Sequence, residues 1–276
     1  TAQKGAANEN VPVRALSEGD GGSVTQENTA SSDATAENAN LTGQDAEQTQ
    51  SGGDCKCGSD GTQLIGQEAD NDQKAAAISA TEQEKPSNSN ISVRVLSPGD
   101  DGDVSQTNEA TSDATAGNLN VTKQEADQTQ SGDCKCGNDG TQIIGQEADS
   151  DQKAAALAAT KQEKPSNTNI SVRVLSPGKG GSVTQTNTAS SNAEAGNFNA
   201  TKQDADQTQT GDACKCKHGG TQLIGQSADN DQKAVALSAT VQEKPSNTNT
   251  PIRVLSKGDD GDVSQTNEAT SDATAG

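Results

Sequence analysis

Four segments of the chain repeat the same short sequence at a nearly constant interval. Each contains an arginine, and Arg14, Arg94, Arg173 and Arg253 lie 80, 79 and 80 residues apart. A period of this length is typical of repeat proteins, in which each unit packs mainly against its neighbours. The sequence therefore predicts tandem units. We place their boundaries at 1–7 (the end of a preceding repeat), 8–87 (repeat 1), 88–166 (repeat 2), 167–246 (repeat 3) and 247–276 (a partial repeat 4).

Within each unit, the residues that stay the same occupy every other position. In the second unit Val104, Gln106, Asn108 and Ala110 begin such a run, which continues for roughly thirty residues, while the positions between them vary freely. Side chains on a β-strand point alternately to its two faces, so this pattern indicates one packed face and one solvated face.

The packed face carries small side chains and amides instead of large apolar side chains. Buried Asn and Gln are costly unless they are hydrogen-bonded, and stacking identical amides from successive units satisfies them. The predicted stacking ladder consists of Gln26, Asn28, Gln106, Asn108, Gln185, Asn187, Gln265 and Asn267.

The second half of each unit follows the same alternating scheme. A shift of 39 residues lays Gln226 on Asn187 and Thr240 on Thr201, which indicates that each unit is itself a tandem pair. We therefore predict an all-β fold, a β-solenoid of repeats of about 80 residues, each made of two rungs of about 40 residues. Because the alternation outlasts an ordinary strand, we expect bends at residues 116–118 and 195–197, and sharper breaks at 97–100 and 85–88.

Composition narrows the function classes. Only 28% of residues are hydrophobic, the net charge is −20, and Phe198 is the sole aromatic residue. These values are also typical of disordered acidic chains, so disorder is the alternative to the solenoid. The acidity argues against binding nucleic acid or anionic membranes, and no apolar run is long enough for membrane insertion. No nucleophile, base and orienting group recur together, so we expect no enzymatic activity.

Three Cys-Lys-Cys motifs lie in Gly- and Asp-rich segments. In a repetitive, aromatic-poor chain they indicate disulfides formed in an oxidising compartment, either within a motif or to another chain. With two rungs a unit, equivalent cysteines of successive units are about 9.5 Å apart, which disfavours bonds between repeats. The disulfide candidates are Cys55, Cys57, Cys134, Cys136, Cys214 and Cys216.

Metal binding is the alternative for two motifs. Paired thiolates suit a thiophilic metal such as Cu(I) or Zn, although His218 is the only histidine. Residues 100–103 and 259–262 read Asp-Asp-Gly-Asp and suggest calcium, but residues 20–23 and 179–182 lack this pattern. We therefore interpret the acidic segment as a solvated turn and expect no cofactor.

The strings Gln-x-Asn-x-Ala at 106–110 and Asn-x-Thr-x-Gln-x-Ala-x-Gln at 120–128 resemble the strand repeats of curli-type fibre subunits. The resemblance covers the alternating segments only. It implies a secreted protein of the extracellular space or cell surface, whose β-solenoid polymerises head to tail into functional-amyloid fibres of a biofilm matrix.

The sequence thus predicts a self-assembling, disulfide-stabilised structural subunit of an extracellular filament, with other copies of itself as its partner. Thr1 and Gly276 align with residues inside the strands of other units, so we also expect uncapped sheet edges at both ends. The alternatives are an ice- or surface-binding β-solenoid, suggested by Thr184, Thr186 and Thr188, and a disordered acidic stalk or metal-binding tail.

Overall fold

The computed structural model describes residues 1–52, 61–132, 140–211 and 220–276. These residues form thirteen β-strands and no helix. The first long strand of each unit is β4 (Val24–Gly52), β7 (Val104–Gly132), β10 (Val183–Gly211) and β13 (Val263–Ala275). The second is β5 (Thr62–Glu84), β8 (Thr141–Glu163) and β11 (Thr221–Glu243), preceded by β1 (Ala2–Lys4). A short strand follows: β2 (Ala7–Asn10), β3 (Val13–Ala15), β6 (Ser87–Val95), β9 (Ser166–Val174) and β12 (Ser246–Val254).

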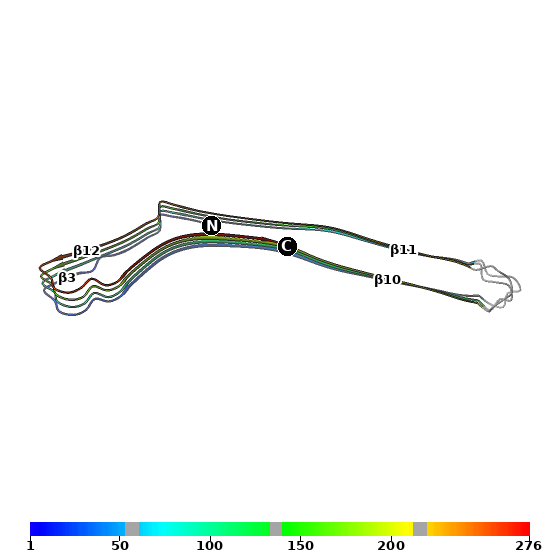
Figure 1. Cartoon of the computed structure of the whole chain (residues 1–276), viewed down its shortest axis with the longest axis horizontal. Helices are drawn as coiled ribbons and strands as arrows, with labels where there is room; N and C mark the ends of the chain where they lie inside the picture. The colour runs from blue at the N-terminus through cyan, green and yellow to red at the C-terminus, as the bar shows by residue number, and fades with distance from the viewer. Residues whose placement is uncertain (53–60, 133–139, 212–219) are drawn as a thin grey trace.

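Equivalent strands of successive units stack in parallel and in register. Val24 pairs with Val104, Val104 with Val183, and Val183 with Val263. The same holds for the other two strand classes, giving sheets in the orders β4-β7-β10-β13, β1-β5-β8-β11 and β2-β6-β9-β12, with β3 also on β6. In Figure 1 the copies of each strand lie over one another, and the stacks of β10 and β11 run along the length of the molecule as two facing layers. The all-β solenoid predicted from the alternation is confirmed.

The predicted subdivision into two rungs a unit is wrong. The two halves of a unit belong to different sheets that face each other, so one whole unit makes one rung, a term we use for one level of the stack. The reason is that each half stacks best on its own copy, where identical amides meet. The expected division of these segments into shorter strands is also wrong, because β7 continues without interruption through Gly117 and β10 through Gly196.

The sharper breaks lie where the sequence predicts them. Lys85 has a positive φ of 51° between β5 and β6, and Leu96 has a φ of 52° at the end of β6. Non-glycine residues rarely adopt this left-handed conformation, so both positions are sharp, specific corners. The chain keeps its direction across the step from β11 into β12 and reverses only after β12 (Figure 1). Gly99, with a φ of 133°, then leads the chain back towards β7.

Small side chains let the facing sheets approach closely. The burial of β5 and β8 alternates strictly along the strand, as a period of two requires. One core cluster consists of alanines alone, among them Ala114, Ala156 and Ala195. A smaller cluster joins Ile65, Ala126 and Ile144. Between these apolar clusters the interior is filled by amides.

Candidate functional site

The predicted glutamine ladder is a continuous chain of hydrogen bonds. Gln106 Nε2 donates to Gln26 Oε1 over 2.7 Å, and Gln185 Nε2 donates to Gln106 Oε1 over 2.8 Å. Gln265 Nε2 extends the chain to Gln185 Oε1 at 2.7 Å. Gln106 and Gln185 also use their second N–H, which they donate to the backbone carbonyls of Thr168 in β9 and Thr248 in β12.

The asparagine ladder lies two residues further along the same strands. Asn28 Nδ2 donates to Asn108 Oδ1 over 2.9 Å, Asn108 donates to Asn187 over 2.9 Å, and Asn187 donates to Asn267 over 2.8 Å. Asn108 also donates to Asn167 of β9 over 3.0 Å, so two ladders are joined side by side. The eight ladder residues are therefore brought together in two columns.

The two ladders run in opposite directions. The three glutamines that follow Gln26 each donate towards the preceding unit, whereas the three asparagines before Asn267 each donate towards the following unit. A rung therefore presents different atoms on its two sides. The side nearer the C-terminus offers Gln oxygens and Asn N–H groups, and the opposite side offers their complements.

Sequence analysis missed most of the other ladders. In the second half of each unit and in the short strands, the side chains that recur at every other position stack in the same way. This recurrence was the sequence signal that could have identified them. These further columns include Asn8–Asn88–Asn167–Asn247, Gln63–Gln142–Gln222, Gln67–Gln146–Gln226, Gln73–Gln152–Gln232 and Gln3–Gln83–Gln162–Gln242.

The repeated arginine belongs to a buried ion network. Arg94 and Arg173 are each 1% exposed, and they lie in register on neighbouring rungs. Arg94 Nε donates to Asp101 Oδ1 over 2.6 Å, and Arg173 Nε donates to Asp101 Oδ2 over 2.9 Å. The remaining guanidinium nitrogens donate to backbone carbonyls, including Gly19 O and Gly99 O. One carboxylate thus serves two arginines.

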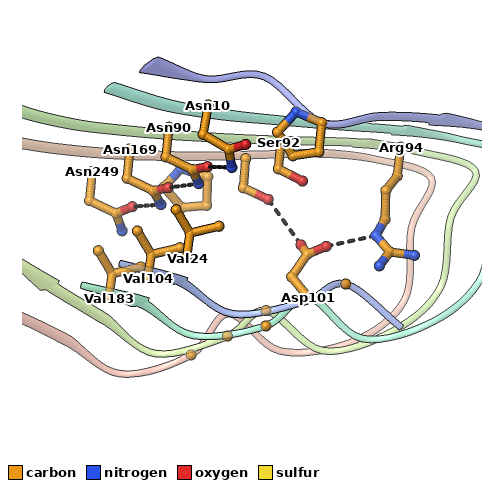
Figure 2. A pocket seen from close by; sticks show the side chains of 18 of the residues that line it. Asn10, Val24, Asn90, Ser92, Arg94, Asp101, Val104, Asn169, Val183 and Asn249 are labelled. Atoms are coloured by element: carbon orange, nitrogen blue, oxygen red, sulfur yellow. Dashed lines mark hydrogen bonds and ion pairs between the residues drawn. The ribbon is translucent and has the colours of Figure 1, made fainter. Parts of the chain in front are cut away.

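A cavity of about 230 Å³ lies beside this network. Figure 2 shows the column of Asn10, Asn90, Asn169 and Asn249 along it, opposite a column of valines, with Asp101 turned towards Arg94. Each Asn of the column donates to the next over 2.7 Å. The cavity lining therefore repeats from rung to rung along the stack.

The acidic segment is a turn in which Asp100 and Asp103 are exposed, as the sequence indicated, but Asp101 is not solvated in this way. The side chain of Asp101 is 13% exposed and is held by both arginines and by Ser171 Oγ at 3.2 Å. For Asp101 the prediction was wrong, because this carboxylate compensates the charge of a buried arginine pair although it is not kept in every unit. No cluster of His, Cys, Asp and Glu suited to a metal ion occurs in the described part of the chain.

The six cysteines lie outside the described residues. The predicted separation of about 9.5 Å between equivalent cysteines requires two rungs a unit, and the strands that flank the motifs do not stack in this way. Gly52 pairs directly with Gly132, and Thr62 pairs directly with Thr141. The flanks of equivalent motifs are therefore one strand spacing apart, about 4.8 Å.

Charged side chains on the outer surface form local pairs. The Lys85 ammonium beside Glu84 lowers the pKa of that carboxyl, and Lys164 lowers the pKa of Glu163 in the same way. Such exposed pairs contribute little to stability, because water and salt screen them. Among the side-chain interactions, the ladders and the arginine network, not the surface charges, add most to the backbone pairing that joins one rung to the next.

Comparison with known proteins finds no matching family model, no similar curated protein and no similar solved structure. In the portions of the chain that the structure describes, no helix has the length and apolar character needed to cross a bilayer.

Proposed function

We propose that this chain is a structural subunit of a secreted extracellular or cell-surface filament, which grows head to tail as the rungs of one copy stack on those of the next. The observation that carries the proposal is the direction of the ladders. Gln265 leaves its Oε1 and Asn267 its amide on the outer edge of β13, while Gln26 and Asn28 carry the complementary atoms on β4. Stacking a second copy continues each hydrogen-bond chain without a change of direction.

The backbone supports the same mode of growth. The outermost strand β13 is exposed along its whole length, and β11 is exposed over 221–233 and at every other residue beyond. Their outer N–H and C=O groups are the template on which a parallel strand adds. In such a filament identical copies of the chain form a homopolymer, and the function of the chain is structural, not catalytic. Disulfides between or within the Cys-Lys-Cys motifs stiffen it, which is the chemistry expected outside the cell.

The ice-binding alternative is less well supported. A flat row of threonines is its main requirement, and the outward column at Thr188 does not provide one. The neighbouring members of that column are Glu109 and Glu268, which place a carboxylate on every second rung.

Assembly of the purified chain tests the filament proposal. We expect unbranched filaments by electron microscopy above a critical concentration. Their X-ray fibre diffraction should show a reflection at about 4.8 Å along the axis. Gln265→Lys places an ammonium in the ladder of the exposed edge and should block growth. Thr266→Lys places the same charge on the outward face of the same strand and should not. A random-coil circular dichroism spectrum, or a wild-type chain that stays monomeric, contradicts the proposal.

A further inference from the structure

The acidic loops of successive units differ in a regular way. We use the name Asp-Gly loop for residues 18–23, 98–103, 177–182 and 257–262. The position of Asp101 is Gly21 in the first loop, Gly180 in the third and Asp260 in the fourth. Because Asp101 binds the arginine of its own rung and that of the next, a carboxylate is needed only on every second rung.

The side chains of these loops bind in one direction only. Asp100 Oδ1 accepts a hydrogen bond from the backbone N–H of Lys179 over 2.7 Å, and Asp103 Oδ1 accepts from that of Ser182 over 2.8 Å. Asp101 reaches the same following rung through Arg173. The three carboxylates of an acidic loop thus all hold the rung on its C-terminal side.

The fourth loop presents the same three carboxylates with nothing bound on that side. Arg253 Nε donates to Asp260 Oδ1 over 2.7 Å, and the Asp260 side chain is 49% exposed. Among the described residues, no hydrogen bond reaches Asp260 Oδ2 or the side chains of Asp259 and Asp262. These atoms are equivalent to the ones with which Asp100, Asp101 and Asp103 hold the third rung.

The first rung carries the complementary donors. Arg14 is in register with Arg94, its own loop has Gly21 where the carboxylate would be, and within the described residues it forms no ion pair. Its one hydrogen bond runs from Nη1 to Gly19 O over 3.5 Å. The backbone N–H groups of Asp20 and Ser23 are equivalent to those of Lys179 and Ser182.

We propose that the fourth rung of one copy binds the first rung of a second copy through these groups, with Asp260 shared between its own Arg253 and the Arg14 of the second copy. Asp259 and Asp262 accept the backbone N–H groups of Asp20 and Ser23 of the second copy. The interface places a rung whose loop carries the carboxylate against a rung whose loop has glycine there. This match fixes the direction in which the copies stack and continues the alternation of carboxylate and glycine loops from one copy to the next. This inference rests on the proposed filament, and it names the contact that selects the end to which each copy adds.

A double-mutant cycle on the critical concentration for assembly tests this contact. Arg14 and Asp260 lie on opposite ends of one chain, so coupling between them reports contact between copies. Arg14→Gln and Asp260→Asn should each raise the critical concentration about tenfold, the effect of losing one charge-assisted hydrogen bond. The double variant should be no worse than either single variant, because the second change removes a bond already lost.

The control is Glu268→Gln, which removes the same charge from the outward face of the same end and should leave the critical concentration unchanged. Arg14→Gln removes only one long hydrogen bond from the folded chain, so it tests the contact even if Asp260→Asn disturbs its loop. If the two substitutions raise the critical concentration additively, or if Arg14→Gln behaves like the control, this inference is wrong and the filament proposal is unaffected. A wild-type chain that never assembles overturns both.

Discussion

Arg94 and Arg173 lie one above the other on neighbouring rungs and share the carboxylate of Asp101. Two guanidinium groups about 4.8 Å apart in a buried site repel each other strongly unless a negative charge lies between them. The arrangement explains why the arginine occurs in every unit and the aspartate in every second one.

Replacement of this carboxylate should be severely destabilising. Asp101→Asn leaves two buried arginines without a counter-charge, and we expect a loss of about 3–5 kcal/mol in the free energy of unfolding, measured by denaturant titration. Asp113→Asn is the matched control, because Asp113 is exposed and Asn192 already holds the equivalent position in the next unit. Equal effects of the two substitutions would show that Asp101 does not carry this role.

A carboxylate inside the ladder should make stability depend on pH. Gln106 is fully buried, so burial raises the folded-state pKa of a glutamate placed there. A carboxyl with a raised folded pKa destabilises the fold as the pH rises above its unfolded value of about 4.3. Gln106→Glu should therefore cost at least about 2 kcal/mol at neutral pH and clearly less in acid, as followed by thermal melts.

The control for that experiment is Thr107→Glu. It adds the same charge one residue along, on the outward face where the first unit already has Glu27. The new carboxylate lies beside Glu27, so we expect a loss of less than about 1 kcal/mol when both are ionised, well below that of Gln106→Glu. A Thr107→Glu variant as unstable as Gln106→Glu would contradict the assignment of inward and outward faces.

The alanine cluster should not tolerate larger side chains. Ala156 is 3% exposed and packs between the two facing sheets, so Ala156→Leu should force them apart and cost about 1–3 kcal/mol. Ala155→Leu changes the exposed neighbour, whose equivalent in the next unit is Val235, and should be close to neutral. Denaturation midpoints of the two variants measure the difference, and equal midpoints would argue against close approach of the sheets.

A glycine should stabilise the corner at Lys164. This lysine has a φ of 49°, and the corresponding position at the end of the preceding repeat, in residues 1–7, is Gly5, with a φ of 62°. Relief of the left-handed strain exceeds the added entropy of glycine in the unfolded chain, so Lys164→Gly should raise the free energy of unfolding by about 0.5–1 kcal/mol.

The same substitution should also alter the response to acid. Lys164 lowers the pKa of Glu163, and stability from a lowered carboxyl pKa is present above the unfolded value and lost as the pH falls through the folded value. The variant lacks this contribution, so its advantage over the wild type should grow in acid. An advantage that shrinks there would contradict the role of the ion pair.

The fold class was predictable because a period of two is a local property. Alternate positions, such as Gln106, keep the same residue in every unit, while the positions between them, such as Thr107, vary. This pattern indicates a strand with one buried face, whichever strand it pairs with. The size of a rung was not predictable in this way. Both halves of a unit alternate, so the pattern is the same whether they stack on each other or face each other across the core.

The arginine network was out of reach for a different reason. Comparison of units treats a residue that varies as unimportant, and Asp101 varies with Gly21 and Gly180. Its role depends on a contact between rungs, in which one carboxylate serves two units. The invariant arginine in a chain of small and amide side chains was the one available signal that a partner had to exist.

Each unit of about 80 residues is one rung in register with the next. Lys123 and Lys202 report on this register, since they pair across neighbouring strands and both side chains are exposed. Nitroxide labels at these two positions, in a background with the native cysteines replaced by serine, should lie about one strand spacing of 4.8 Å apart and show strong spin exchange in the electron paramagnetic resonance spectrum. If the labels instead lie about two spacings apart, with weak dipolar broadening and no exchange, the halves of a unit form separate rungs and the account is wrong.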